Sequence, residues 1–162
     1  MKNLKFLFLL AFALLLAKPA FALQCKDGTY LASDECWTEV KVSDLETTRV
    51  IPGTVLEFDA TTDTSEKNGY TVRVANASAD WAAIAGVAQT NIATGDQGRI
   101  LVRGKGKVRV PANNISSRDF LYASGTAGSL GVVASASNAS PSAFALQSAT
   151  TASTIDAFIV VL

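Results

Sequence analysis

The chain has 162 residues, of which 49% are hydrophobic and 17% charged, and its 14 basic side chains balance 14 acidic ones. It contains no histidine, which excludes the commonest general base and the commonest transition-metal ligand. The first 22 residues hold three lysines and no acid, so the remaining 140 carry 11 basic and 14 acidic side chains, a net charge of −3. Such a chain attracts phosphate backbones weakly, and we expect no nucleic-acid partner.

Residues 1–22 have the pattern of a secretory signal peptide. Two lysines come first, an apolar run follows from residue 6 to 17, and Ala20-Phe-Ala22 supplies the small residues of a cleavage site after Ala22. Twelve helical residues span about 18 Å, which is short of a ~30 Å hydrocarbon core and favours cleavage over the alternative of an uncleaved anchor. We therefore expect a secreted, periplasmic or cell-surface protein with no stable membrane span after signal cleavage.

Two cysteines, Cys25 and Cys36, follow the expected cleavage point and are separated by ten residues. In an oxidising compartment, such a pair most simply closes a small loop through a disulfide, whereas redox or metal sites need closer spacing or more ligands. Free thiols or intermolecular pairing are the alternatives. Residues 23–49 are accordingly interpreted as a disulfide-stapled N-terminal segment that precedes a β-rich domain over residues 50–162.

From residue 50 onward, short β-type runs alternate with Gly, Asn, Ser and Asp. This spacing predicts an all-β fold, a compact β-sandwich or β-barrel-like domain, with short helical turns at 79–83 and 116–119. The expected strands cover residues 54–59, 70–75, 84–90, 99–103, 107–111, 120–123, 130–134, 143–148 and 157–162.

The segment 99–110 is predicted to be a hairpin that turns tightly at Gly104 and Gly106. It concentrates five of the eleven positive charges that follow residue 22, namely Arg99, Arg103, Lys105, Lys107 and Arg109. One interpretation is a solvated sheet face. The other is an interface for acidic neighbouring subunits or a polyanionic surface.

The sequence ends on an apolar run, which we add to the candidate interface: Phe158, Ile159, Val160, Val161 and Leu162. An exposed edge of this kind invites aggregation. The run is therefore expected either to be buried as a central strand or to pair with another subunit.

No residue pattern in the chain points to catalysis. Without histidine or a Ser-x-x-Lys motif, the serines have no evident base, and the acids are few and lie in predicted loops. The run Gly104-Lys-Gly-Lys107 lacks the Gly-Lys-Ser/Thr ending of a phosphate-binding loop. We expect a non-enzymatic protein with no cofactor and no metal.

A series of short motifs resembles the small β-rich capsid decoration proteins of tailed bacteriophages, also called head-fibre or head-stabilising proteins. The motifs occur in the order Ala85-Gly-Val-Ala, Gly106-Lys-Val-Arg-Val-Pro111, Arg118-Asp-Phe-Leu-Tyr122, Gly128-Ser-Leu-Gly-Val-Val133, Phe144-Ala-Leu and Phe158-Ile-Val-Val-Leu162. The resemblance covers residues 50–162, here with a signal peptide added. It implies a compact β-sandwich or barrel-like module that assembles, often as trimers, on a larger surface.

Together these observations predict an exported structural protein, homo-oligomeric or built into a larger protein assembly such as a capsid, filament or cell surface. The alternative is a secreted binding module or adhesin that recognises carbohydrate or cell-surface ligands.

Overall fold

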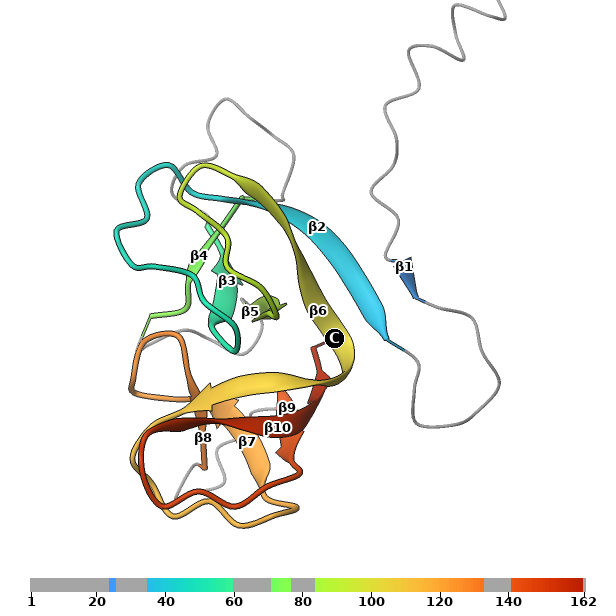
Figure 1. Cartoon of the computed structure of the whole chain (residues 1–162), viewed down its shortest axis with the longest axis vertical. Helices are drawn as coiled ribbons and strands as arrows, with labels where there is room; N and C mark the ends of the chain where they lie inside the picture. The colour runs from blue at the N-terminus through green and yellow to red at the C-terminus, as the bar shows by residue number, and fades with distance from the viewer. Residues whose placement is uncertain (1–23, 26–34, 60–70, 77–83, 133–140, 162) are drawn as a thin grey trace, which may run out of the picture.

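The computed structural model describes residues 24–25, 35–59, 71–76, 84–132 and 141–161, and within these ranges every regular element is a β-strand (Figure 1). The all-β prediction is therefore confirmed. The strands are β1 (Gln24–Cys25), β2 (Cys36–Val42), β3 (Val55–Phe58), β4 (Thr71–Val74), β5 (Ile84–Ala88), β6 (Gln97–Val110), β7 (Phe120–Ala123), β8 (Leu130–Gly131), β9 (Ala143–Ala145) and β10 (Ser153–Val160).

Five of these strands close into a small barrel. The strand order runs β2–β4–β3–β5–β6, and β6 also pairs with β2, which completes the ring. The β2–β4 pair is parallel, while the other four pairs are antiparallel. Closure removes free sheet edges from these strands, and the barrel occupies the upper half of Figure 1.

Small and β-branched side chains fill the barrel interior. Inward-facing residues alternate along the strands, as Val40 and Val42 do on β2 and Val72 and Val74 do on β4. The rest of this buried cluster comprises Val50, Leu56, Ala85, Ala88, Ile92 and Ile100. Five strands enclose little volume, which explains why valine and alanine dominate here.

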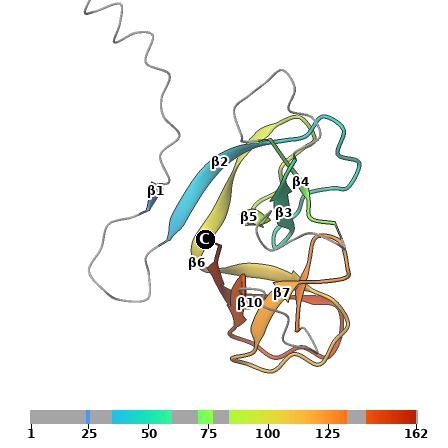
Figure 2. The same ribbon diagram turned by 180° about the vertical axis from the view of Figure 1, so that it is seen from behind.

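The second half of β6 leaves the barrel and begins a second sheet. There it pairs with β10 from Arg103 to Val110, and the order continues through β9 and β7 to β8. Figure 2 shows this sheet from behind, below the barrel, with β7 and β10 crossing under the end of β6. One long strand thus belongs to both parts of the fold.

A second core lies between the barrel and this sheet. It joins residues from the outer side of the barrel, including Val55, Val87 and Leu101, to Leu121 and Ile159 of the second sheet. The barrel interior on one side and the second core on the other together bury all five residues of β5, and they bury Val55 and Leu56 of β3 in the same way. The second core therefore holds the barrel and the second sheet together.

The predicted hairpin at 99–110 is wrong, because β6 is one strand of 14 residues. Gly104 has a φ of 122°, which lets the strand bend where it passes from β2 to β10 instead of reversing. Gly106 makes room for a neighbour, since a Cβ there would lie 2.6 Å from Leu101 Cδ2 and 2.9 Å from Gln89 Cδ. The glycines thus permit bending and close packing rather than a turn.

The side chain of Gln89 takes the place of a strand beside the bent part of β6. Its Oε1 accepts a hydrogen bond from the Lys107 amide at 2.7 Å, and its Nε2 donates to the Lys107 carbonyl at 3.0 Å. Further along, the Arg109 amide donates to the Gly53 carbonyl at 2.9 Å. These contacts satisfy the edge of β6 that faces away from β10.

The turn predicted at 116–119 is present, but it is not helical. Residues 117 and 118 form a hydrogen-bonded turn in which the Asp119 amide donates to the Ser116 carbonyl at 3.1 Å. Arg118 has a φ of 81°, which is incompatible with a right-handed helix. The other predicted turn, at 79–83, lies outside the described residues.

The segment before residue 50 contributes directly to the barrel. Strand β2 pairs with β6 along Cys36–Lys41 and with β4 at Lys41 and Val42. Residues 36–42, which the sequence pattern assigned to the N-terminal segment, therefore form part of the barrel wall. Upstream, β1 pairs with the start of β2 so that Cys25 and Cys36 are directly opposite. This register supports the predicted disulfide, which stays a prediction.

The apolar C-terminal run adopts the first of its two expected arrangements. β10 lies between β6 and β9, and Phe158 and Ile159 pair with both neighbours. The Ile159 side chain is fully buried, and Val161 packs against the shared core. Leu162 lies outside the described residues. Both edges of β10 are thus used within the chain over this stretch.

Candidate contact surface

Three phenylalanines form a row across the second sheet. Phe158 on β10 is the register partner of Phe144 on β9, which is also the partner of Phe120 on β7. On the other side, Phe158 is paired with Lys105 of β6. We call Phe120, Phe144 and Phe158 the phenylalanine row.

The row lies on the outer face of the sheet because side chains alternate along each strand. Ala143 and Ala145 on either side of Phe144 are buried, as are Ala157 and Ile159 on either side of Phe158. Phe120 is 50% exposed, and its ring centroid lies 4.9 Å from that of Phe144, with the planes tilted by 53°. The rings of Phe120 and Phe144 therefore pack against each other across the strands, Phe120 is exposed, and Phe144 and Phe158 are half-buried on the same face.

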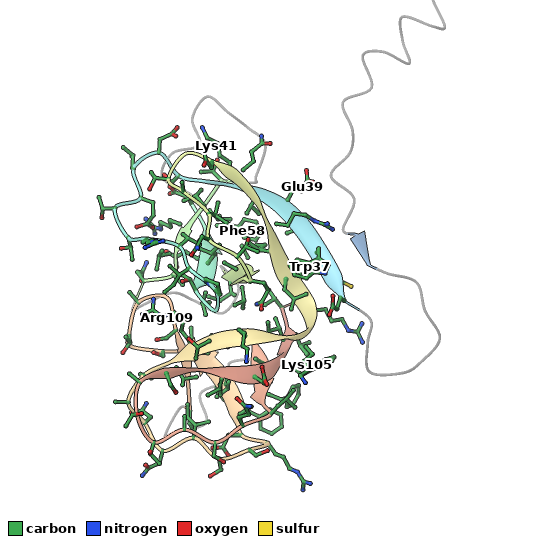
Figure 3. All side chains as sticks on the ribbon, viewed as in Figure 1. Trp37, Glu39, Lys41, Phe58, Lys105 and Arg109 are labelled. Carbon is green, nitrogen blue, oxygen red and sulfur yellow. The ribbon has the colours of Figure 1, made fainter. Side chains whose placement is uncertain are left out.

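Positive charges border the row. Arg103, Lys105 and Lys107 alternate along β6 and are all exposed. Lys107 bonds to Asp156 on β10 at 2.7 Å, whereas Arg103 and Lys105 form no ion pair within the described residues. Figure 3 shows Lys105 beside the bend of β6. The face thus combines aromatic rings with two exposed cations, Arg103 and Lys105, that have no ion-pair partner among the described residues.

The charge pattern keeps Asp156 ionised. Its hydrogen bond with Lys107 and the charges of Lys107 and Lys105 together hold the pKa of Asp156 below its ordinary value. The carboxylate therefore compensates Lys107 throughout the neutral range. Two of the three basic residues that border the row are left to attract an acidic surface.

The remaining two basic residues predicted at this interface have other surroundings. The Arg99 guanidinium lies 5.7 Å from the ring centre of Trp37, whose indole N–H donates to Glu35 at 3.2 Å. The half-buried Arg109 sits over Gly53, where an added Cβ would lie 3.1 Å from Arg109 Cγ. Figure 3 shows Trp37 on β2 and Arg109 near the far end of β6. The structure thus divides the predicted basic cluster among three locations.

The C-terminal residues predicted at the interface also do not lie together on one surface. Phe158 and Val160 are half-buried and face outward, but Ile159 points into the core. Sequence reasoning missed Phe120 and Phe144, although the alternation in Ala143-Phe-Ala145 indicated an outward aromatic. Only the register of β7, β9 and β10 brings the rings together.

The buried carboxylate of Glu57 has a structural environment. It is 2% exposed, and its Oε1 accepts hydrogen bonds from Arg73 Nε at 2.7 Å and Asn76 Nδ2 at 2.9 Å. Since Glu57 and Arg73 are register partners on β3 and β4, the pair joins two barrel strands. Within the described ranges, no group of three or more acids or cysteines is arranged to hold a metal.

Comparisons with known proteins give one informative likeness. No family model and no curated protein matches the chain. Among solved structures, the chain is similar to the N base of the head fibre protein gp8.5 of bacteriophage phi29, with a TM-score of 0.50 and 13% sequence identity. The match covers 77% of this chain and 93% of the phage chain. At this identity it supports a head-fibre-like fold. Separately, no helix in the described residues is long and apolar enough to cross a membrane.

Proposed function

We propose that the chain is a non-enzymatic structural module that works by contact, associating with copies of itself or decorating a larger assembly such as a capsid. The observation that carries the proposal is the phenylalanine row, a cross-strand series of rings on the open face of the second sheet, bordered by Arg103 and Lys105. The head-fibre-like fold is consistent with this use, since the similar phage protein is the base of a head fibre.

The chemistry of the row suits binding to a protein surface. Aromatic residues and arginine are enriched in the buried centres of protein interfaces. An aromatic ring buries a large area with few rotatable bonds, and a guanidinium forms several hydrogen bonds. Phe144 and Phe158 lie on strands that are paired on both sides, so little backbone freedom remains to be lost on association. The unpaired cations add attraction for an acidic rim.

The test is the mass in solution, over a range of concentrations, of protein purified after expression of the full chain. We expect concentration-dependent association for the natural chain and about a tenfold weaker association for Phe120→Ser, which corresponds to ~1.4 kcal/mol. Phe58→Ser is the matched control, because Phe58 is 43% exposed but lies on β3 of the barrel. Lys105→Glu provides a second variant that leaves the rings intact.

Equal association of the natural chain, Phe120→Ser and Lys105→Glu would contradict a contact role for this face. A protein that stays monomeric and binds glycans would instead favour the adhesin function, since exposed aromatic rings also stack on sugars. Circular dichroism spectra of each variant separate a lost contact from a lost fold.

We also propose that the chain is exported, cleaved after Ala22 and closed by a Cys25–Cys36 disulfide. The support is the residue pattern of 1–22 and the direct opposition of the two cysteines in the β1–β2 register. Intact mass measurement of the exported protein should show loss of residues 1–22 and no thiol that reacts with iodoacetamide before reduction. Retention of the first 22 residues would contradict cleavage, and alkylation without reductant would contradict the bridge.

A further inference from the structure

The loop after β2 presents a leucine to solvent. Leu45 is 75% exposed, the highest value among the large hydrophobic side chains of the described residues. Its neighbours Asp44 and Glu46 are acidic. We call residues 43–46 the Leu45 loop.

This loop is firmly held in place. Ser43 is buried. Its amide donates a hydrogen bond to the Val72 carbonyl at 2.8 Å, and its hydroxyl accepts one from the Leu45 amide at 3.3 Å. The Glu46 carboxylate accepts from the Val74 amide at 2.7 Å, and the Glu46 carbonyl accepts from the Thr94 hydroxyl at 3.0 Å. Because the loop is already fixed by these hydrogen bonds, its backbone loses little entropy when Leu45 contacts a partner. An exposed leucine on a fixed loop is therefore well suited to bind another surface.

The Leu45 loop and the phenylalanine row lie at opposite ends of the molecule. β2 runs from Cys36, opposite Arg103 at the bend of β6, to Lys41, opposite Gln97 at its start. The second sheet begins at Arg103, so the residues after Val42 emerge at the far end of the barrel. Figures 1 and 2 agree, with the loop at the top and the second sheet at the bottom.

The charges of the two ends have opposite signs. Around the Leu45 loop, the acids Asp44, Glu46 and Asp96 outnumber the bases Lys41 and Arg49. Lys41 is paired with Asp44 at 2.9 Å, which leaves Glu46 and Asp96 against Arg49. Asp96 is exposed and forms no ion pair within the described residues. Beside the phenylalanine row, three bases border one acid, Asp156. Each end thus offers an apolar centre with a rim complementary to the other.

We infer that the phenylalanine row binds the Leu45 loop of a second copy of this chain. The inference rests on the proposed function and names the partner surface. Such a contact joins two different patches, so after pairing one copy keeps a free Leu45 loop and the other keeps a free phenylalanine row. Because the patches lie at opposite ends, repetition builds a head-to-tail row of molecules instead of a closed two-fold dimer.

The test uses two variants, each defective at one end. Phe120→Ser removes a ring from the row but keeps the Leu45 loop, whereas Leu45→Ser does the reverse. Each alone should associate about tenfold more weakly than the natural chain in sedimentation velocity. At a concentration where neither variant associates alone, an equimolar mixture should form a dimer and nothing larger. Phe58→Ser should associate like the natural chain.

The outcomes separate this inference from the proposed function. If Phe120→Ser weakens association but Leu45→Ser does not, the row is a contact surface with another occupant, and the inference fails alone. A mixture that forms no dimer, although both variants are folded, also overturns it. If neither variant weakens association, the proposed role of the row fails as well. Leu45 is exposed, so its replacement leaves the core intact.

Discussion

Removing Phe158–Leu162 is expected to abolish cooperative folding. The deletion takes away residues of β10 that pair with Lys105, Gly104 and Arg103 of β6, and it removes the partners of Phe144 and Ala143 on β9. It also removes the hydrogen bonds from the Val160 amide to Ser142 and from the Val161 amide to Val102, each 2.9 Å long. A central strand cannot be lost without exposing the core that the barrel and the second sheet share. Thermal unfolding followed by circular dichroism should show no cooperative transition.

A pair of neighbouring substitutions gives a graded form of this prediction. Ile159→Ala should lower the free energy of unfolding by about 3–4 kcal/mol, because Ile159 is fully buried and its truncation leaves a cavity. Val160→Ala should cost less than about 1.5 kcal/mol, since Val160 is half-buried on the outer face. Urea denaturation provides both values. If the two substitutions lowered the free energy of unfolding equally, the alternation of buried and outward side chains along β10 would be contradicted. Because the deletion is expected to unfold the protein, it does not test assembly.

Gly86→Ala is expected to lower the free energy of unfolding by about 2–4 kcal/mol, through backbone strain together with overpacking. Gly86 is buried in β5 with a φ of 152°, and an added Cβ would lie 2.9 Å from both the Leu101 carbonyl oxygen and Ile100 Cδ1. The carbonyl belongs to the backbone of β6, so it has little freedom to move away. Chemical denaturation is again the measurement.

Gly125→Ala is the matched control for this substitution. Gly125 is exposed, and a Cβ there would meet no heavy atom within 4 Å outside its chain neighbours. Its replacement should change the free energy of unfolding by less than about 0.5 kcal/mol. If Gly86→Ala changed the free energy of unfolding as little as Gly125→Ala, the close packing of β5 against β6 in the barrel would be contradicted.

The sequence predicted individual strands well where polar and apolar residues alternate between turn residues. The expected strand at 120–123 agrees with β7, and those at 54–59 and 70–75 enclose β3 and β4. The sequence prediction was wrong for β6, because its glycines are compatible with two different backbone conformations. Gly104 and Gly106 suit a hairpin turn as well as a bend in a continuous strand. The choice between them depends on β2, β10 and the Gln89 side chain, which are distant along the chain.

For the candidate surface, the sequence identified the cluster of positive charges on 99–109 but not that its members lie at different places in the fold. Arg103, Lys105 and Lys107 remain together beside the phenylalanine row, while Arg99 packs over Trp37 and Arg109 over Gly53. Likewise, no local pattern connects Phe120 with Phe144 or Phe158. These residues become neighbours only through the register of three strands.

By itself, the sequence determined that this is an all-β chain without histidine chemistry, because strand alternation and residue composition are local properties. The tertiary structure alone decided that β2 closes a barrel, that β10 is a central strand and that three phenylalanines share an open face. These features depend on which strands pair and in what register. Pairing is set by how distant apolar faces are buried together, and no stretch of neighbouring residues contains that information.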